Sequence, residues 1–284
     1  MATKGSKYAL ITGCGQGGIG EALAREYMSR GVVPIATILP SESSKHLSDA
    51  KITWFHLDVT SDSSIADLKS KILEHTGGNL DILVNNAGIC YTMPAADTDV
   101  IAVQKMFDVN VFGPMRMVHV FHDMIIRSKG TIVNIGSIGG IVPYVYGASY
   151  NATKAALHHW SSTLRVEMAP FEVKVLTIIS GEVGTNFLKT DRDRELPENS
   201  FYLPLANEFK EHVRRIPETT DRFQYAEKVV SQSLRSSPPV WFWYGHASFL
   251  IRLIDMFAPR KFWGFLLWGM FKFDKLKTAH LKRE

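Results

Sequence analysis

Residues 8–20, Y-A-L-I-T-G-C-G-Q-G-G-I-G, decide the fold class. A short apolar run leads into glycines, and residues 21–28, E-A-L-A-R-E-Y-M, follow with helical periodicity, which predicts a strand, a turn and a helix. Glycines allow positive φ and close backbone approach, and the free N–H groups at a helix start favour a pyrophosphate. A purely structural turn is the alternative reading, because a glycine-rich turn alone is a weak signal.

Strands and helices alternate over the next 170 or so residues. Strands are expected at residues 32–38, 52–57, 80–84, 131–135 and 174–179, and helices at 65–73, 100–127 and 150–168. Such alternation implies right-handed crossovers and helices on both faces of a parallel sheet. The prediction is an α/β protein: a doubly wound, Rossmann-like domain over residues 1–190, followed by a hydrophobic C-terminal extension over 191–284.

Composition narrows the class of partner and the compartment. The formal charge of the 284-residue chain is +4, and no long Lys/Arg block suggests nucleic acid as a partner. The two cysteines, Cys14 and Cys90, make no disulfide framework and have no metal-knuckle spacing, which fits a reducing compartment. The first eight residues leave no room for the apolar part of a signal peptide. A cytoplasmic location is expected.

Residues 149–157, S-Y-N-A-T-K-A-A-L, place Tyr150 and Lys154 one helical turn apart. Residues four apart share one face of a helix, so the phenol and the ammonium can converge on one point. By itself this spacing fits a solvated helix face as well as a catalytic pair.

Four further motifs appear in order: L-D-V-T from Leu57, N-N-A-G from Asn85, V-N-V-F-G from Val109 and N-I-G-S-I-G-G from Asn134. Each alone could be a turn, a helix cap or a loop acid. As an ordered set in which Ser137 lies thirteen positions before Tyr150, they resemble the short-chain dehydrogenase/reductase family over residues 7–187. One extra residue in the glycine motif, together with G-T-N-F from Gly184, is similar to the fungal branch that includes 1-acyldihydroxyacetone-phosphate reductases.

The resemblance implies a division of labour among four catalytic residues. Tyr150 is implied as the acid in ketone reduction or the base in the reverse direction, with its phenol pKa lowered by the Lys154 ammonium together with the cationic nicotinamide. Lys154 also holds the nicotinamide ribose, and Ser137 donates a hydrogen bond to the substrate oxygen. Asn110 supports a water-linked proton path to Lys154.

The same resemblance implies a set of cofactor-binding positions. These are Gly13, Gly17, Ile19, Thr37, Asp58, Val59, Asn86, Ala87, Gly88, Tyr150, Lys154, Val183 and Thr185. The chain departs from the family's usual Pro-Gly after the late strand, where it has Ser180-Gly181. No metal is expected, because His119, His122 and the pair His158-His159 lack a carboxylate or cysteine that would complete a ligand set.

The choice between NADP(H) and NAD(H) depends on the end of the second strand. An NAD enzyme usually places an acid there for the ribose hydroxyls, and here Thr37 occupies that neighbourhood. The arginine that relatives offer to a 2′-phosphate is replaced by Ile38-Leu39, with Ser41, Ser43 and Lys45 as substitutes. The missing acid and the resemblance together favour NADP(H) over NAD(H).

An apolar pocket is expected beside Tyr150, formed by residues 141–147, I-V-P-Y-V-Y-G, and by 89–91, I-C-Y. The prediction is an NADPH-dependent ketoreductase for a bulky hydrophobic small molecule, such as a lipid intermediate or a polyketide- or terpenoid-like metabolite. Glycerolipid synthesis is one option, in which Lys189, Arg192 and Arg194 would meet a phosphate; a solvated loop is the other reading of that stretch. A dinucleotide-binding protein that catalyses cyclisation or isomerisation without net redox is the competing class.

Residues 240–273 are rich in Trp, Phe and Leu. They are expected either to cap the active-site mouth, to bury a dimer face, or to lie on the cytosolic face of a membrane or a lipid droplet. Charged residues interrupt the apolar run before the roughly 20 residues that a spanning helix needs. The resemblance also implies a homo-oligomer built on the Tyr150 helix.

Overall fold

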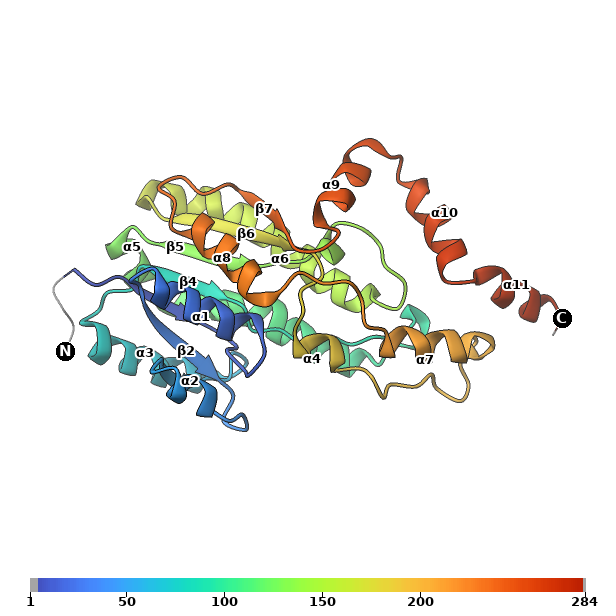
Figure 1. The fold of residues 1–284 in the computed structure, drawn as a ribbon, viewed down its shortest axis with the longest axis horizontal. Coiled ribbons are helices and arrows are strands. Elements are labelled where there is room, and N and C mark those ends of the chain that lie inside the picture. The colour runs from blue at the N-terminus through green and yellow to red at the C-terminus, as the bar shows by residue number, and fades with distance from the viewer. Residues whose placement is uncertain (1–4, 283–284) are drawn as a thin grey trace.

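Seven parallel strands form one sheet in the computed structural model, which describes residues 5–282. The strands are β1 (Tyr8–Ile11), β2 (Val33–Ile38), β3 (Thr53–His56), β4 (Ile82–Asn85), β5 (Thr131–Ile135), β6 (Lys174–Ser180) and β7 (Trp241–Tyr244). Their order across the sheet is β3-β2-β1-β4-β5-β6-β7 (Figure 1). The order reverses between β1 and β4, which creates the crevice where doubly wound sheets bind ligands.

Helices cover both faces of this sheet and bury two separate apolar clusters. On one face, α1 (Ile19–Ser29) and α8 (Arg222–Ser233) pack side by side against the central strands. On the other face lie α3 (Asp62–Thr76), α5 (Gly113–Ser128) and α6 (Ala148–Met168). The doubly wound, Rossmann-like fold predicted from the alternation is confirmed.

Local chemistry explains where individual helices begin and end. The Ser61 hydroxyl accepts a hydrogen bond from Ser64 N at the start of α3, and Gly77 ends that helix with a left-handed φ of 64°. The Asp221 carboxylate accepts from Phe223 N and Gln224 N and so begins α8. Ser61 and Asp221 thus satisfy donors that the first helical turn leaves without partners.

The helix α8 and the strand β7 were not predicted from the sequence. Both α8 and β7 lie beyond residue 190, so the sheet draws on both of the segments that the sequence analysis separates. The helix expected over residues 100–127 is also divided, into α4 (Val100–Phe107), a single π-helical turn, η2 (Asp108–Phe112), and α5. An apolar run as short as W-F-W-Y fits a strand or a helix, and no periodicity marks an inserted π turn.

The other elements of residues 191–282 stand beyond the carboxyl ends of the strands. Here lie η6 (Leu203–Leu205), α7 (Ala206–Arg214), α9 (Ser248–Phe257), α10 (Lys261–Met270) and α11 (Phe273–Leu281), of which α9 to α11 extend away from the sheet (Figure 1). A third apolar cluster joins α7 and α10 to the loop around Tyr146. Among residues 5–282, none of the helices is both long and apolar enough to cross a bilayer.

The core makes a direct test of this architecture possible. Phe121 on α5 is fully buried in the cluster formed with α3 and α6. Phe121→Ala should lower the free energy of unfolding by about 3–5 kcal/mol, through lost transfer energy and the cavity left behind. Urea unfolding measures the loss, and Phe171→Ala, at a 49% exposed position, is the control. Equal effects of the two substitutions would contradict the packing described.

Candidate active site

The glycine-rich turn after β1 lies against the turn after β4. A Cβ on Gly13 would stand 2.8 Å from the Ala87 Cα, and the Gly13 φ is +70°. Gly17 is also left-handed, with a φ of +76°, and Ile19 begins α1 directly after the turn. This is a cradle that side chains would fill, of the form in which backbone N–H groups and a helix start receive a pyrophosphate.

The N-N-A-G motif holds that cradle in place. The Thr12 hydroxyl accepts hydrogen bonds from the backbone N–H groups of Asn86 and Ala87, each at 3.0 Å. In return, the Asn86 amide donates to the carbonyls of Thr12 and Gly13, each at 2.8 Å. The two predicted cofactor segments are therefore one hydrogen-bonded unit at the switch point of the sheet.

Tyr150, Lys154 and Ser137 come together where β5 meets α6. Tyr150 and Lys154 occupy successive turns of α6, with the Lys154 Nζ 5.7 Å from the centroid of the Tyr150 ring. The Ser137 hydroxyl lies near enough to the Tyr150 phenol to lower its pKa. The Lys154 Nζ donates to the Ile135 carbonyl at 2.8 Å, which ties the lysine to the end of β5.

Asn110 lies in the π-helical turn η2 and joins the loop after β4 to α6. Its amide accepts from Ile89 N and donates to Ile89 O, both at 2.9 Å, and donates to the Thr153 hydroxyl at 3.1 Å. A Cβ on Gly88 would stand 3.3 Å from the Asn110 Oδ1 and 3.9 Å from the Lys154 Nζ. Asn110 and Lys154 therefore flank Gly88, the placement that a water-linked path between them requires.

Burial governs the ionisation of this group. It raises the pKa of Tyr150 well above the usual value for a phenol, and the interaction with Ser137 offsets only part of that effect. Burial also lowers the pKa of Lys154 to about 8. In the protein without cofactor, the desolvation of Tyr150 is the largest influence on the phenol pKa. The expected lowering by Lys154 together with a cationic nicotinamide stays a prediction for the cofactor-bound protein.

His158 holds the backbone of Ser137 in place, a role that was not predicted from the sequence. The His158 Nε2 accepts a hydrogen bond from Ser137 N at 3.1 Å, and the ring fills the space over Gly136, where a Cβ would stand 2.2 Å from Nε2. Burial, followed by the charge of Lys154, lowers the pKa of His158 to about 3, so the imidazole stays neutral and can accept. Its position four residues after Lys154, on the same face of α6, was the available signal.

The other predicted cofactor residues differ in burial and in hydrogen bonding. Thr37 is buried and its hydroxyl donates to the Ile11 carbonyl, so it links β2 to β1 instead of facing a ribose. Asp58 accepts from the backbone N–H and the hydroxyl of Thr60, while the neighbouring Val59 is buried. Val183 is buried and Thr185 half-buried in the segment after β6.

Glu42, which was not predicted as a site residue, places its carboxylate next to the glycine-rich turn. Glu42 Oε2 accepts from Leu39 N at 2.8 Å, and Oε1 lies 2.7 Å from where a Gly15 Cβ would be. This is the end of β2, where dinucleotide-binding folds place the adenosine ribose. The proposed substitute Lys45 is paired instead with Asp49 on the surface, at 2.8 Å.

Asp191 fastens the segment after β6 to the loop after β4. This buried carboxylate accepts from Thr92 N at 2.8 Å and from the Arg194 guanidinium at 2.7 and 2.9 Å. The guanidinium also lies 4.2 Å from the centroid of the Tyr91 ring. Arg194 is thus held by Asp191 and Tyr91 and is not free to bind a phosphate. This argues against the option in which Arg194 meets a phosphate together with Lys189 and Arg192.

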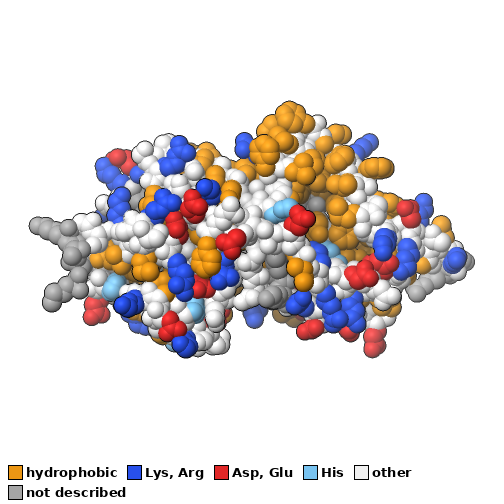
Figure 2. Space-filling view, in the orientation of Figure 1, with side chains coloured by type: hydrophobic (Ala, Val, Ile, Leu, Met, Phe, Trp, Pro, Cys, Tyr) orange, Lys and Arg blue, Asp and Glu red, His pale blue; other side chains and the backbone are white. Residues whose placement is uncertain are grey.

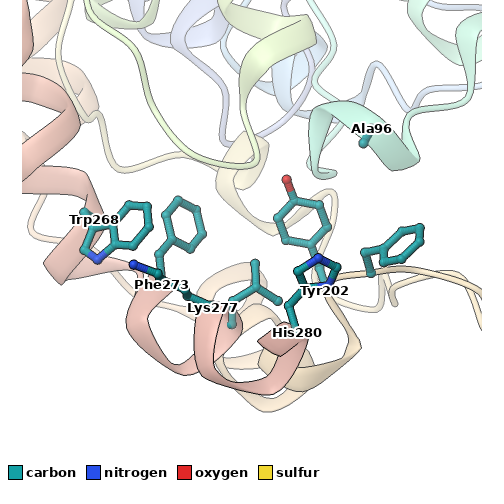
Figure 3. Close-up of a pocket in the computed structure, with 8 residues that line it drawn as sticks. Ala96, Tyr202, Trp268, Phe273, Lys277 and His280 are labelled. Atoms are coloured by element: carbon teal, nitrogen blue, oxygen red, sulfur yellow. The ribbon is translucent and has the colours of Figure 1, made fainter. Parts of the chain in front are cut away.

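Aromatic side chains surround the loop that leads into Tyr150, and the Phe187 ring lies 6.0 Å from the Tyr150 ring, centroid to centroid. Tyr146 packs edge-on against Phe209 and Phe271, at ring distances of 5.0 and 5.4 Å. Behind this cluster lies a cavity of about 450 Å³ between the C-terminal helices and the segment around Tyr202 (Figure 3). It is lined by Ala96, Phe201, Tyr202, Trp268, Phe273, Leu276, Lys277 and His280. Tyr202 and Phe273 belong both to the lining of this cavity and to the apolar cluster around Tyr146.

The histidines considered as metal ligands have other surroundings. The His122 Nδ1 pairs with the His119 carbonyl at 2.7 Å, and His158 serves Ser137 as described. In the part of the chain that the structure covers, no three His, Cys, Asp or Glu side chains gather as a metal site would require.

Comparisons with known proteins identify the family. The family model for short chain dehydrogenases matches residues 7–196. The chain is 66% identical to the short-chain dehydrogenase virD of Hypocrea virens over 279 residues, 98% of this chain and 97% of that one. It is 43% identical to an NADPH-dependent 1-acyldihydroxyacetone phosphate reductase of Schizosaccharomyces pombe over 202 residues, 70% of this chain and 68% of that one.

Solved structures agree with the fold. A short-chain dehydrogenase from Streptomyces avermitilis superimposes with a TM-score of 0.77 at 24% identity, over 98% of this chain and 99% of that one. A serine dehydrogenase complexed with NADP+ gives 0.72 at 27% identity, over 84% and 94%. The chain belongs to the short-chain dehydrogenase family and is an oxidoreductase.

The lowered pKa of Lys154 predicts a pH-dependent stability. Between its folded pKa of about 8 and its ordinary value of 10.5, the unfolded chain binds more protons, so stability rises with pH across that window. Without nucleotide, Lys154→Met should be the more stable protein at pH 7, by roughly 1–3 kcal/mol, because it removes the cost of burying a charge. The difference should shrink at pH 9.5. Urea unfolding at both pH values measures it, with the exposed Lys45→Met as control; a difference independent of pH would contradict the assignment.

Proposed function

We propose that this oxidoreductase is an NADPH-dependent ketoreductase that acts, reversibly, on a bulky hydrophobic ketone. The observation that supports this best is the meeting of Tyr150, Ser137 and Lys154 beside the glycine cradle, at the switch point of the sheet. A proton donor, a hydrogen-bond donor and a cation are the groups that carbonyl reduction needs, because negative charge develops on the substrate oxygen. The bound nicotinamide supplies the hydride.

Each side chain has a distinct task in this proposal. Tyr150 gives its proton to the carbonyl oxygen, and the burial that raises its pKa keeps it protonated, and so ready as an acid, at neutral pH. Ser137, positioned by His158, donates to the same oxygen. Lys154 carries a proton near neutral pH, since its pKa is about 8, and can pass one to Tyr150 from the side of Asn110.

The aromatic surroundings support the hydrophobic class of substrate. Tyr91, Tyr144 and Tyr146 belong to the apolar cluster around the loop that leads into Tyr150. The cavity that shares Tyr202 and Phe273 with this cluster is lined mainly by aromatic and aliphatic side chains. A lipid intermediate or a polyketide- or terpenoid-like ketone fits such a site. The relative named as a 1-acyldihydroxyacetone phosphate reductase supports the glycerolipid option. The engagement of Arg194 with Asp191 weighs against a phosphate at that position.

NADP(H) is proposed over NAD(H) as the cofactor. The Schizosaccharomyces pombe relative is named as NADPH-dependent, and several structural neighbours were solved with NADP. Glu42 opposes this preference, because a carboxylate at the ribose end of the cradle repels a 2′-phosphate. The proposal therefore requires Glu42 to turn away when NADPH binds.

We propose in addition that the chain is a cytoplasmic homo-oligomer that contacts a membrane or lipid droplet through its tail. The family resemblance supports assembly through α6. The apolar, cationic composition of residues 240–284 supports the membrane contact.

Replacing the proton donor tests the redox function. Purified protein should bind NADPH in a calorimeter and oxidise it in the presence of a member of a panel of lipophilic ketones. Tyr150→Phe should lower kcat roughly 10² to 10⁴-fold with NADPH binding kept, since only the proton transfer is removed. Tyr244→Phe, on β7, is the matched control and should keep its activity. Unchanged turnover in Tyr150→Phe would refute the proposal, and binding without oxidation across the panel would favour cyclisation or isomerisation.

Neutralising Glu42 tests the cofactor site. Glu42→Gln should tighten NADPH binding about tenfold and change NADH binding less than twofold, because only NADPH brings a 2′-phosphate to that carboxylate. Calorimetric titrations with both dinucleotides measure the two affinities, and Glu74→Gln on α3 is the control. If both affinities changed equally, Glu42 would not face the ribose.

A further inference from the structure

The helix α9 carries an apolar stripe with no partner in the structure. Its large hydrophobic side chains Phe249, Leu250, Leu253, Met256 and Phe257 are exposed, with Phe257 at 78%. At 100° per residue these positions fall within an arc of about 120°, whereas the half-buried Ile251 and Ile254 lie outside it. Figure 2 shows hydrophobic side chains massed over α9 and the adjoining part of α10. Patches of this kind mark interaction surfaces.

The next helix, α10, is apolar on every side. Lys261 at its first position is its only charged residue. Trp263 and Leu267 are buried against the body of the protein, but Phe265 on the outer side is 84% exposed. A helix that is hydrophobic all round is normally covered all round, so its outer side indicates a second apolar environment.

The positive charge of the whole chain resides in this tail. Residues 240–284 contain eight Lys and Arg against three Asp and Glu, whereas residues 1–239 contain 24 against 25. Arg252, Arg260 and Lys261 flank the exposed apolar residues directly. An anionic surface would complement this arrangement.

We infer that α9 and α10 together dock the protein on a phospholipid bilayer with anionic headgroups. Each helix has ten residues, about 15 Å of rise, so each lies in the interface with its apolar side among the acyl chains. A second copy of the chain is the less suitable occupant, because a symmetric contact would bring two strongly cationic tails together.

Docking through α10 would also place the bilayer next to the active site. The inner side of this helix contributes Leu267 to the aromatic cluster, and Phe271, which follows it, contacts the ring of Tyr146. One helix thus separates the lipid-facing surface from the loop that borders Tyr150. This step rests on the proposed ketoreductase function and makes the membrane the source of its lipophilic substrate.

Vesicle binding by the full-length protein tests the docking without using turnover. Wild-type protein should co-sediment with vesicles of phosphatidylcholine and phosphatidylserine more than with phosphatidylcholine alone, and less at high salt. The double variant Phe257→Gln/Phe265→Gln should bind roughly tenfold more weakly, and Lys261→Glu likewise. Phe171→Gln and Lys71→Glu, on the body of the protein, are matched controls that should bind as the wild type does.

The outcomes separate this inference from the proposed function. Equal binding to both kinds of vesicle, or binding that the double variant retains, would overturn the docking, whatever the turnover. So would a wild-type dimer that ignores vesicles and becomes monomeric in the double variant by light scattering, because a second copy would then cover the stripe. Vesicle binding by a protein that oxidises no NADPH with any ketone would keep the docking surface and refute the reductase.

Discussion

The backbone contact between Gly13 and Ala87 is the constraint on which the rest of the site depends. It brings the turn after β1 within van der Waals distance of the turn after β4, and no side chain fits between them. The Thr12 and Asn86 hydrogen bonds fix the two turns at that separation. The glycine-rich turn and the loop after β4 therefore form one unit at the reversal of strand order, where doubly wound sheets bind ligands.

Burial and the interaction with Ser137 shift the pKa of Tyr150 in opposite directions. Desolvation raises the pKa of Tyr150 and lowers those of Lys154 and His158, so all three tend toward their neutral forms. Neutrality suits the separate tasks: an acid that retains its proton, a lysine that can release one, and an imidazole that accepts from Ser137. The apolar setting of the three side chains sets these protonation states.

Local patterns predicted the sheet, most helices and the spacing of Tyr150 and Lys154. This is because hydrophobic periodicity and helix capping depend on residues that are close together in the sequence. Features that depend on distant contacts were missed. The partners of Asp191 include Thr92, 99 positions away, and β7 becomes a strand by pairing with β6. Glu42 and His158 acquire their importance from glycines on other segments, whose missing side chains leave room for them. Contacts of this kind, between distant segments, leave no periodic pattern in the sequence from which they could be predicted.

Tyr150, Lys154 and His158 recur every fourth residue along α6, an unbroken helix of 21 residues. The proton donor, the cation and the support of Ser137 therefore move as one rigid piece. Loops elsewhere can lengthen or change sequence without altering this alignment, but one residue inserted between Tyr150 and Lys154 would rotate the lysine by about 100°. Three of the side chains therefore depend on one helix that tolerates no insertion, while Ser137 and Asn110 come from other segments. Residues 186–282 supply none of these side chains and can vary without disturbing the alignment.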